Sequence, residues 1–138
     1  MPPSGGESSQ ADSSNLRGMR ILLVEDSWQL GMALKNLLRS FEAEVDGPVA
    51  TASDADRLIS QHVPDAAVVD INLRYGERSY GLIDRLIDQG VPVIVTSGYS
   101  NLPTLPAKAY ILEKPFREEK LIAILRSVAG SSERSLDH

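Results

Sequence analysis

The segment that decides the fold is Ala66-Ala67-Val68-Val69-Asp70, four apolar residues that end in a carboxylate. A strand with no polar position before its last residue is typical of the middle of a parallel sheet, where helices cover both faces. Similar apolar runs lie at 21–24, 91–96 and 110–112. Helix-like segments separate these runs. The chain therefore alternates strand and helix, which predicts an α/β domain.

A polar residue stands at or just beyond the end of each of these strands. Glu25 and Asp26 follow the first run, Asp70 ends the 66–70 run, and Ser97 and Lys114 come after the last two. The carboxyl ends of parallel strands meet at one edge of a sheet, so these side chains are predicted to share one pocket. Three carboxylates, a hydroxyl and an ammonium suit a divalent cation and a phosphoryl group.

Composition restricts the function classes. The chain has 138 residues, the length of one domain, and its 42% hydrophobic content is typical of a globular protein. A net charge of -5 argues against nucleic acid or an anionic membrane as the main partner. The absence of cysteine excludes disulfides, thiol catalysis and cysteine metal sites. No apolar run reaches the roughly 20 residues of a membrane helix, and a cytoplasmic protein is expected.

Composition also divides the chain into a domain and two tails. Residues 1–18 are rich in Pro, Gly and Ser and hold few large apolar side chains, which predicts a disordered tail. The folded domain is expected over 19–129 and a flexible tail over 130–138.

Two segments between the strands are expected to be short. A second strand is predicted over 43–46, closed by the turn pair Gly47-Pro48. Pro103 and Pro106 oppose a regular helix between the fourth and fifth strands. The fourth helix is therefore predicted to be short, irregular or absent.

The ordered set of motifs resembles the receiver domain of two-component response regulators over about residues 19–129. The matching motifs are Ile21 to Asp26, Val68 to Asn72, Pro92 to Gly98 and Lys114-Pro115-Phe116. Each motif alone occurs in many α/β proteins, and their order along the chain carries the resemblance. It implies a flavodoxin-like, doubly wound sheet of five parallel strands in the order 2-1-3-4-5, with helices on both faces.

A narrower resemblance points to an alphaproteobacterial type of receiver with a Pro-Phe-x-Phe-Ala-Thr-Gly-Tyr signature. It is carried by Asn72-Leu73, Gly76-Glu77, Pro92 to Tyr99 and the proline-containing stretch before the fifth strand. Here Val93 and Val95 stand in for the phenylalanines, Thr96 for Ala and Ser97 for Thr.

The family resemblance implies a role for each charged residue. Asp70 would accept the phosphoryl group, and Lys114 would contact a phosphate oxygen. Asp26 would ligate Mg²⁺ directly and Glu25 through water, with Asp70 and the backbone carbonyl of Asn72 completing the protein ligands. Mn²⁺ is an alternative ion at such a site.

The resemblance also implies a switch. Ser97, five residues after Pro92, would be the hydroxyl that contacts the phosphoryl group, and Gly98 would leave room for movement. Thr96 is the competing hydroxyl, but alternation along a strand gives it the opposite facing. Pro115 is expected to follow a cis peptide bond that aims the lysine into the pocket.

One departure concerns the switch aromatic of the family. The position three residues before the lysine holds Ile111 instead of Tyr or Phe, with Tyr110 displaced by one residue. Tyr99 is then a candidate to transmit the signal or to line the pocket, and Asn72 and Tyr99 are expected to tune the rates. Trp28, two residues past Asp26, is expected either to pack on the first helix or to sense the metal site.

These expectations describe a stand-alone receiver that catalyses only its own phosphorylation and dephosphorylation. Its donor would be a histidine kinase or a histidine phosphotransfer protein. The signal would pass to a downstream protein, by altered binding or by phosphorelay, from a monomer or weak dimer. A phosphatase with an aspartyl nucleophile is the first alternative, although such enzymes usually carry a second Asp where Asn72 stands. A pseudo-receiver that binds without phosphorylation is the second, since Ile111 replaces the aromatic.

Overall fold

The computed structural model describes residues 16–98 and 108–137. Five parallel strands form one sheet in the order β2-β1-β3-β4-β5. The strands are β1 Arg20–Val24, β2 Glu44–Val49, β3 Ala66–Asp70, β4 Val93–Ser97 and β5 Tyr110–Glu113. The predicted flavodoxin-like fold and strand order are confirmed.

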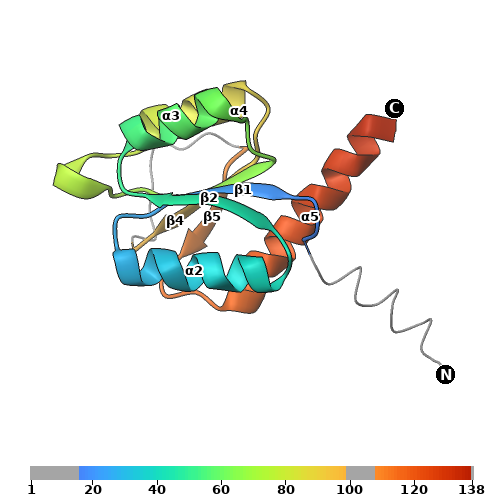
Figure 1. Cartoon of the computed structure of the whole chain (residues 1–138), viewed down its shortest axis with the longest axis horizontal. Coiled ribbons are helices and arrows are strands. Elements are labelled where there is room, and N and C mark those ends of the chain that lie inside the picture. Colours follow the sequence, from blue (N-terminus) through green and yellow to red (C-terminus); the bar gives the residue numbers. More distant parts are fainter. Residues whose placement is uncertain (1–15, 99–107, 138) are drawn as a thin grey trace.

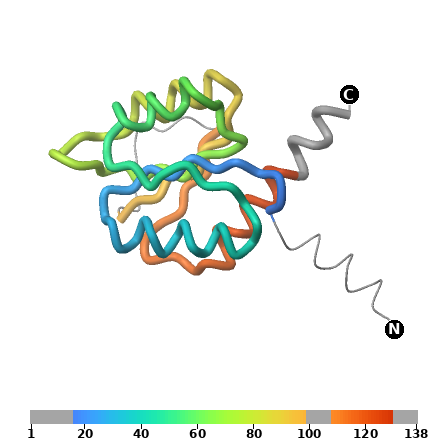
Figure 2. Tube along the Cα trace, viewed as in Figure 1, coloured from blue at the N-terminus to red at the C-terminus, as the bar shows by residue number. Residues whose placement is uncertain are grey.

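Helices cover both faces of the sheet, as predicted. In Figure 1, α3 and α4 lie on one side of the strands and α2 and α5 on the other. Their bounds are α2 Trp28–Ser40, α3 Ala52–Gln61, α4 Tyr80–Asp88 and α5 Glu118–Asp137, with a short 3-10 turn η1 at Arg74–Gly76. The trace in Figure 2 shows that the loop around η1 extends outward from the body of the domain.

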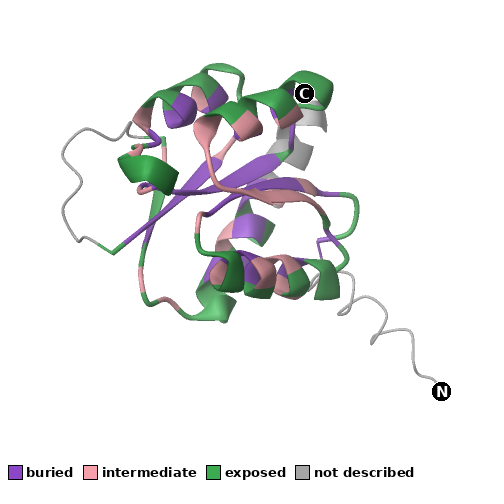
Figure 3. Cartoon of the chain, turned by 60° about the vertical axis from the view of Figure 1, so that its left-hand side comes forward, coloured by how far each residue is buried: buried purple, intermediate pink, exposed green. Residues whose placement is uncertain are grey.

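The sheet separates two apolar cores, because alternate residues of each strand face opposite sides. Ile21, Val68 and Ile94 pack with the inner faces of α2 and α5. Leu22, Val69 and Val95 pack with α3 and α4 on the other side. Figure 3 shows the central strands buried between helices whose outer faces are exposed. This burial on both faces explains why the strands read as unbroken apolar runs.

Local signals set the helix ends. The hydroxyl of Ser27 accepts a hydrogen bond from the N–H of Leu30 at the start of α2, and Thr51 caps α3 in the same way. Gly90, with φ +81°, follows α4 in the left-handed conformation that favours glycine. Acidic Glu118 and Glu119 occupy the first turn of α5, where the helix dipole favours negative charge.

The predicted end of the second strand is wrong. Gly47 and Pro48 lie inside β2, which continues to Val49. The register against β1 shifts between Leu22 and Val24, so a bulge accommodates the two residues without ending the strand. Gly47 adopts φ +110°, and its peptide bond to Pro48 is cis. The strand lies at the edge of the sheet, where proline is tolerated.

The domain boundaries also need correction. Leu16 is buried in the core, and its N–H donates to the carbonyl of Phe41. The folded part therefore includes residues 16–18, which the Pro-, Gly- and Ser-rich composition of 1–18 predicts as tail. Helix α5 continues to Asp137, past the expected end of the domain at 129. Residues 1–15 lie outside the described residues, and the flexibility predicted for 130–138 stays a prediction.

The connection between β4 and β5 carried the prediction of a short or irregular helix. Residues 99–107 lie outside the described residues, so this prediction stays untested. In the described part of the chain, none of the helices is both long and apolar enough to cross a membrane.

Candidate functional site

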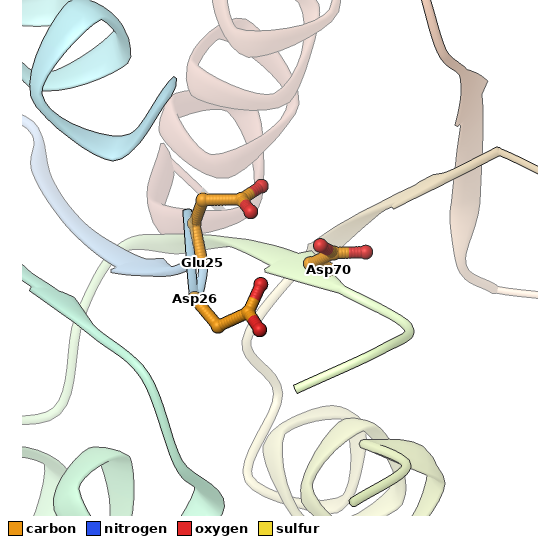
Figure 4. Close-up of side chains that lie close together, drawn as sticks. All are labelled: Glu25, Asp26 and Asp70. Carbon is orange, nitrogen blue, oxygen red and sulfur yellow. The ribbon is translucent and has the colours of Figure 1, made fainter. Parts of the chain in front are cut away.

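Three carboxylates converge at the carboxyl edge of the sheet, where strand order changes direction between β1 and β3. Glu25 and Asp26 follow β1, and Asp70 is the last residue of β3. Figure 4 shows the three side chains close together at this edge. One carboxylate oxygen from each lies within 4.8 Å of the others. The predicted convergence of these residues is therefore what the fold produces.

Asp70 is held on every side. Its side chain is nearly buried, Oδ1 accepts the N–H of Asn72 at 3.2 Å, and Oδ2 accepts the ammonium of Lys114 at 3.0 Å. Its own carbonyl accepts the hydroxyl of Ser79 at 2.7 Å. Main chain and side chain of Asp70 are therefore both fixed, so the carboxylate points into the site without further ordering.

Glu25 is the most enclosed carboxylate of the three, with 2% of its side chain exposed. Its Oε1 lies 3.2 Å from the Lys114 ammonium, and its Oε2 accepts the N–H of Ser27 at 3.1 Å. The N–H of Glu25 donates to the carbonyl of Val49 at 2.8 Å. The β2 bulge thus supports the residue that begins the acidic pair.

Burial and charge act on the ionisation of this cluster. Burial raises the pKa of Glu25 above its ordinary value, and the negative charge of Asp70 adds to the rise. The Ser27 N–H and Lys114 oppose this effect without cancelling it. Burial alone would lower the pKa of Lys114, but its hydrogen bond to Asp70 and the charge of Glu25 raise that pKa overall. The cluster therefore favours an added positive charge.

The donor set fits a hard divalent cation. Three carboxylates and one ammonium leave a formal charge of 1 − 3 = −2. The Asp26 carboxylate, at the more exposed side of the cluster, forms no hydrogen bond or ion pair with any described residue. Oxygen ligands of this kind are those that Mg²⁺ prefers, usually one or two carboxylates with several waters.

Lys114 reaches the site from the loop after β5. Its N–H donates to the carbonyl of Ser97 at 2.7 Å, which joins the ends of β4 and β5. The Lys114–Pro115 peptide bond is cis, as the family resemblance implies. Only 26% of the Lys114 side chain is exposed, so its ammonium is committed to the two carboxylates it contacts.

Two hydroxyls end β4, and both are buried. Thr96 is the register partner of Asp70, as Ile94 is the register partner of Val68. Side chains two residues apart in a strand point to the same face, so Thr96 and Asp70 lie on the same face of the sheet. Ser97 lies one residue nearer the carboxyl edge of the sheet. Ser97 is therefore favoured over Thr96 only by its position at the edge where the carboxylates lie, and its switch role stays a prediction.

Three of the remaining predicted residues lie in the described part of the chain. Gly98 is exposed, and an added Cβ would meet no described atom within 4 Å. Ile111 is 50% exposed on β5, beside the exposed Tyr110. Trp28 is 67% exposed at the first residue of α2, so the expectation that it packs on that helix is wrong. Tyr99 lies outside the described residues.

The structure gives contacts near the site to three residues to which the sequence assigned no role there. The Ser79 hydroxyl supports Asp70, although a serine before a helix usually indicates only a cap. Glu77 accepts the N–H of Ala52 at the start of α3. Arg74 donates to the carbonyl of Asp26 at 3.5 Å. All three belong to the loop after β3, whose path no periodic pattern predicts.

Glu25→Gln is expected to raise the free energy of unfolding at neutral pH without Mg²⁺, because it removes a buried charge whose pKa is raised. A carboxyl group with a raised pKa binds its proton more tightly in the folded state. Stability of the parent chain therefore falls as pH rises above about 4.3, the ordinary glutamate value, and this component is lost in the variant. Urea unfolding across pH, with exposed Glu44→Gln as control, measures both effects.

The same substitution is expected to weaken Mg²⁺ binding by about 10- to 100-fold, the range typical of residues that support a metal from its outer shell. Titration followed by Trp28 fluorescence measures this change. If Glu25→Gln lowers the free energy of unfolding, or leaves the affinity for Mg²⁺ unchanged, then Glu25 is not a buried charge that supports the metal.

Comparison with known proteins finds related sequences and structures. No protein-family model matches the chain. The transcriptional regulatory protein PhoP of Escherichia coli is 32% identical over 118 residues, which cover 80% of this chain and 52% of PhoP. The chain thus spans about half the length of the curated relatives that it matches.

Solved structures agree in fold. The response regulator PhyR from Brucella abortus superposes with a TM-score of 0.78 over 96% of this chain and 56% of PhyR, at 22% identity. A response regulator receiver domain (CheY-like) from Methylobacillus flagellatus gives a TM-score of 0.67 at 27% identity, over 80% of this chain and 98% of that domain. With the strand order and the acidic edge described above, the matches to PhoP and to the Methylobacillus domain support a response regulator receiver (CheY-like) domain.

Proposed function

We propose that this receiver accepts a phosphoryl group on Asp70 in a Mg²⁺-dependent reaction. The observation that carries the proposal is the double contact of the Lys114 ammonium with Asp70 and Glu25, next to the Asp26 carboxylate, which has no partner among the described residues. A nucleophile, a fixed cation and carboxylates suited to a divalent metal then lie in one cluster. Phosphoryl transfer requires little else, because positioning and charge neutralisation supply most of its catalysis.

The transfer step conserves atoms and charge. An oxygen of Asp70 attacks phosphorus, a new O–P bond forms, and the P–N bond of a phosphohistidine donor breaks with its electron pair left on the imidazole nitrogen. Lys114 keeps its proton and contacts a phosphoryl oxygen. Mg²⁺, held by Asp26, Asp70 and the Asn72 carbonyl, with Glu25 acting through water, would neutralise charge on the phosphoryl oxygens.

The donor and the output follow from the same proposal. A histidine kinase or a histidine phosphotransfer protein would supply the phosphoryl group, and acceptance would change binding to a downstream protein or feed a phosphorelay. The chain would catalyse only its own phosphorylation and dephosphorylation. The net charge of -5 supports a protein partner over nucleic acid or an anionic membrane.

Phosphorylation with a small donor tests the proposal. The chain is incubated with acetyl phosphate with and without Mg²⁺, and intact mass spectrometry detects the acyl phosphate. The exposed Trp28, two residues from Asp26, reports binding of Mg²⁺ and then of beryllofluoride, a phosphoryl mimic. We expect Mg²⁺-dependent modification and two saturable fluorescence changes. Absence of all three would leave a binding module that works without phosphorylation.

Ser97→Ala is expected to lower affinity for beryllofluoride by about 10- to 100-fold, because a hydroxyl bonded to a charged group contributes roughly 1.5–3 kcal/mol. If Ser97 couples the site to β5, the mimic should shift the Ile111 amide resonance in the NMR spectrum of the parent chain and shift it less in Ser97→Ala. Thr96→Ala is the matched control, since it removes the neighbouring buried hydroxyl. If Thr96→Ala produces the loss and Ser97→Ala does not, Thr96 is the switch residue.

A further inference from the structure

The loop after β3 holds Arg74 in a fixed position near the acidic site. Its base is closed by two backbone hydrogen bonds, Leu73 N–H to Glu77 carbonyl at 2.8 Å and Ser79 N–H to Ile71 carbonyl at 3.1 Å. The N–H of Arg74 itself donates to the carbonyl of Ala50 at 3.1 Å. The main chain of Arg74 is therefore anchored to the segment between β2 and α3, although its side chain is exposed.

The Arg74 guanidinium points to the acidic pair. It donates one hydrogen bond, at 3.5 Å, to the backbone carbonyl of Asp26. It forms no ion pair with any carboxylate in the described part of the chain, whereas Arg20 and Arg85 each do. A guanidinium has five N–H donors and keeps its charge at any physiological pH. Most of the binding capacity of Arg74 is thus still available beside the site.

The two cations near the cluster differ in what they can bind. Lys114 is largely buried and contacts both Glu25 and Asp70, so it serves the group once it is in the pocket. Arg74 lies on the exposed side, next to Asp26, where an incoming anion arrives. An anion approaching three carboxylates is repelled, and a guanidinium offers phosphate a planar, two-pronged set of donors.

We propose that Arg74 binds the anionic oxygens of the phosphoryl donor at the mouth of the site and favours donors with a dianionic phosphate. The inference rests on the proposed phosphorylation of Asp70 and adds a donor-binding residue to it. Arg74 takes no part in bond making or breaking and remains protonated throughout. Its contribution is to the encounter with the donor and to its orientation before transfer.

The test is the rate of phosphorylation in Arg74→Ala and Arg74→Lys at saturating Mg²⁺, as a function of acetyl phosphate concentration. We expect Arg74→Ala to raise the apparent KM about tenfold with little change in the maximal rate, and Arg74→Lys to restore part of the loss. Phosphoramidate carries one negative charge fewer than acetyl phosphate at neutral pH. Arg74→Ala should therefore raise the apparent KM for phosphoramidate by a smaller factor. Arg78→Ala removes a second exposed arginine of the same loop and is the matched control.

Two outcomes overturn the inference. One is an Arg74→Ala variant whose apparent KM equals that of Arg78→Ala with both donors. The other is an Arg74→Ala variant with a lower maximal rate and with weaker Mg²⁺ binding, as measured by Trp28 fluorescence. Arg74 would then only support the Asp26 backbone. Failure of the underlying proposal is distinguishable, since the parent chain itself would then not be phosphorylated by either donor.

Discussion

Asp70→Asn is expected to abolish acyl phosphate formation, with a fall in rate of at least about a thousandfold. The amide has no negative charge with which to attack phosphorus. In the parent chain Oδ2 of Asp70 accepts a hydrogen bond from the Lys114 ammonium at 3.0 Å, and an NH₂ group at that position could not accept it. The fold should survive, because the side chain keeps its shape and Lys114 retains Glu25 as a partner. Intact mass after acetyl phosphate treatment measures the loss, and circular dichroism checks the fold.

Asp56→Asn is the matched control for this change. Asp56 is an exposed aspartate of α3 that pairs with Arg85 on the surface. Surface pairs of this kind contribute about 0–1 kcal/mol, so the control should fold and be phosphorylated like the parent chain. An acyl phosphate of unchanged yield in Asp70→Asn would move the acceptor to another residue, which peptide mapping would then identify.

Gly47→Ala is expected to cost about 3 kcal/mol of folding free energy or more, at the upper end of single substitutions. A Cβ at this position would clash with the Leu23 carbonyl oxygen, a backbone atom of the neighbouring strand. The residue also adopts φ +110°, which L side chains rarely tolerate. Either the strand separates from β1 or the bulge is lost, and urea unfolding measures the result.

Gly90→Ala separates the two causes. Gly90 also has a positive φ, +81°, but an added Cβ there meets nothing within 4 Å. The control pays only the conformational cost, about 1–2 kcal/mol. Equal losses in both variants would show that the contact with Leu23 has no effect. In surviving Gly47→Ala protein we also expect weaker Mg²⁺ binding, because the neighbouring Val49 carbonyl accepts the N–H of Glu25.

The charged part of the candidate site was predictable because it depends on topology alone. Glu25, Asp26, Asp70 and Lys114 stand at or after strand ends, and parallel strands of an α/β domain bring those ends together whatever the details of packing. The same reasoning could not reach Ser79 or Arg74. Their positions depend on the path of an irregular loop, which hydrogen bonds between its own backbone groups determine.

The second strand shows why local signals can mislead. Gly-Pro is a frequent turn pair, and the sequence gives no sign that a bulge against β1 lets the chain stay extended to Val49. Leu16 gives a similar lesson. A single leucine in a polar segment reads as part of a tail, but it fills a place in the core under Phe41 that only the folded chain creates.

By itself, then, the sequence determined the α/β class, the strand order through its family motifs, and the residues that converge on one edge, because periodicity and strand ends are local properties. Only the tertiary structure decided how that edge is arranged. It placed Lys114 between Asp70 and Glu25, raised the pKa of Glu25 by burial and by the charge of Asp70, and set Arg74 beside Asp26. These features depend on distances between segments far apart in the chain, and such distances exist only once the chain has folded.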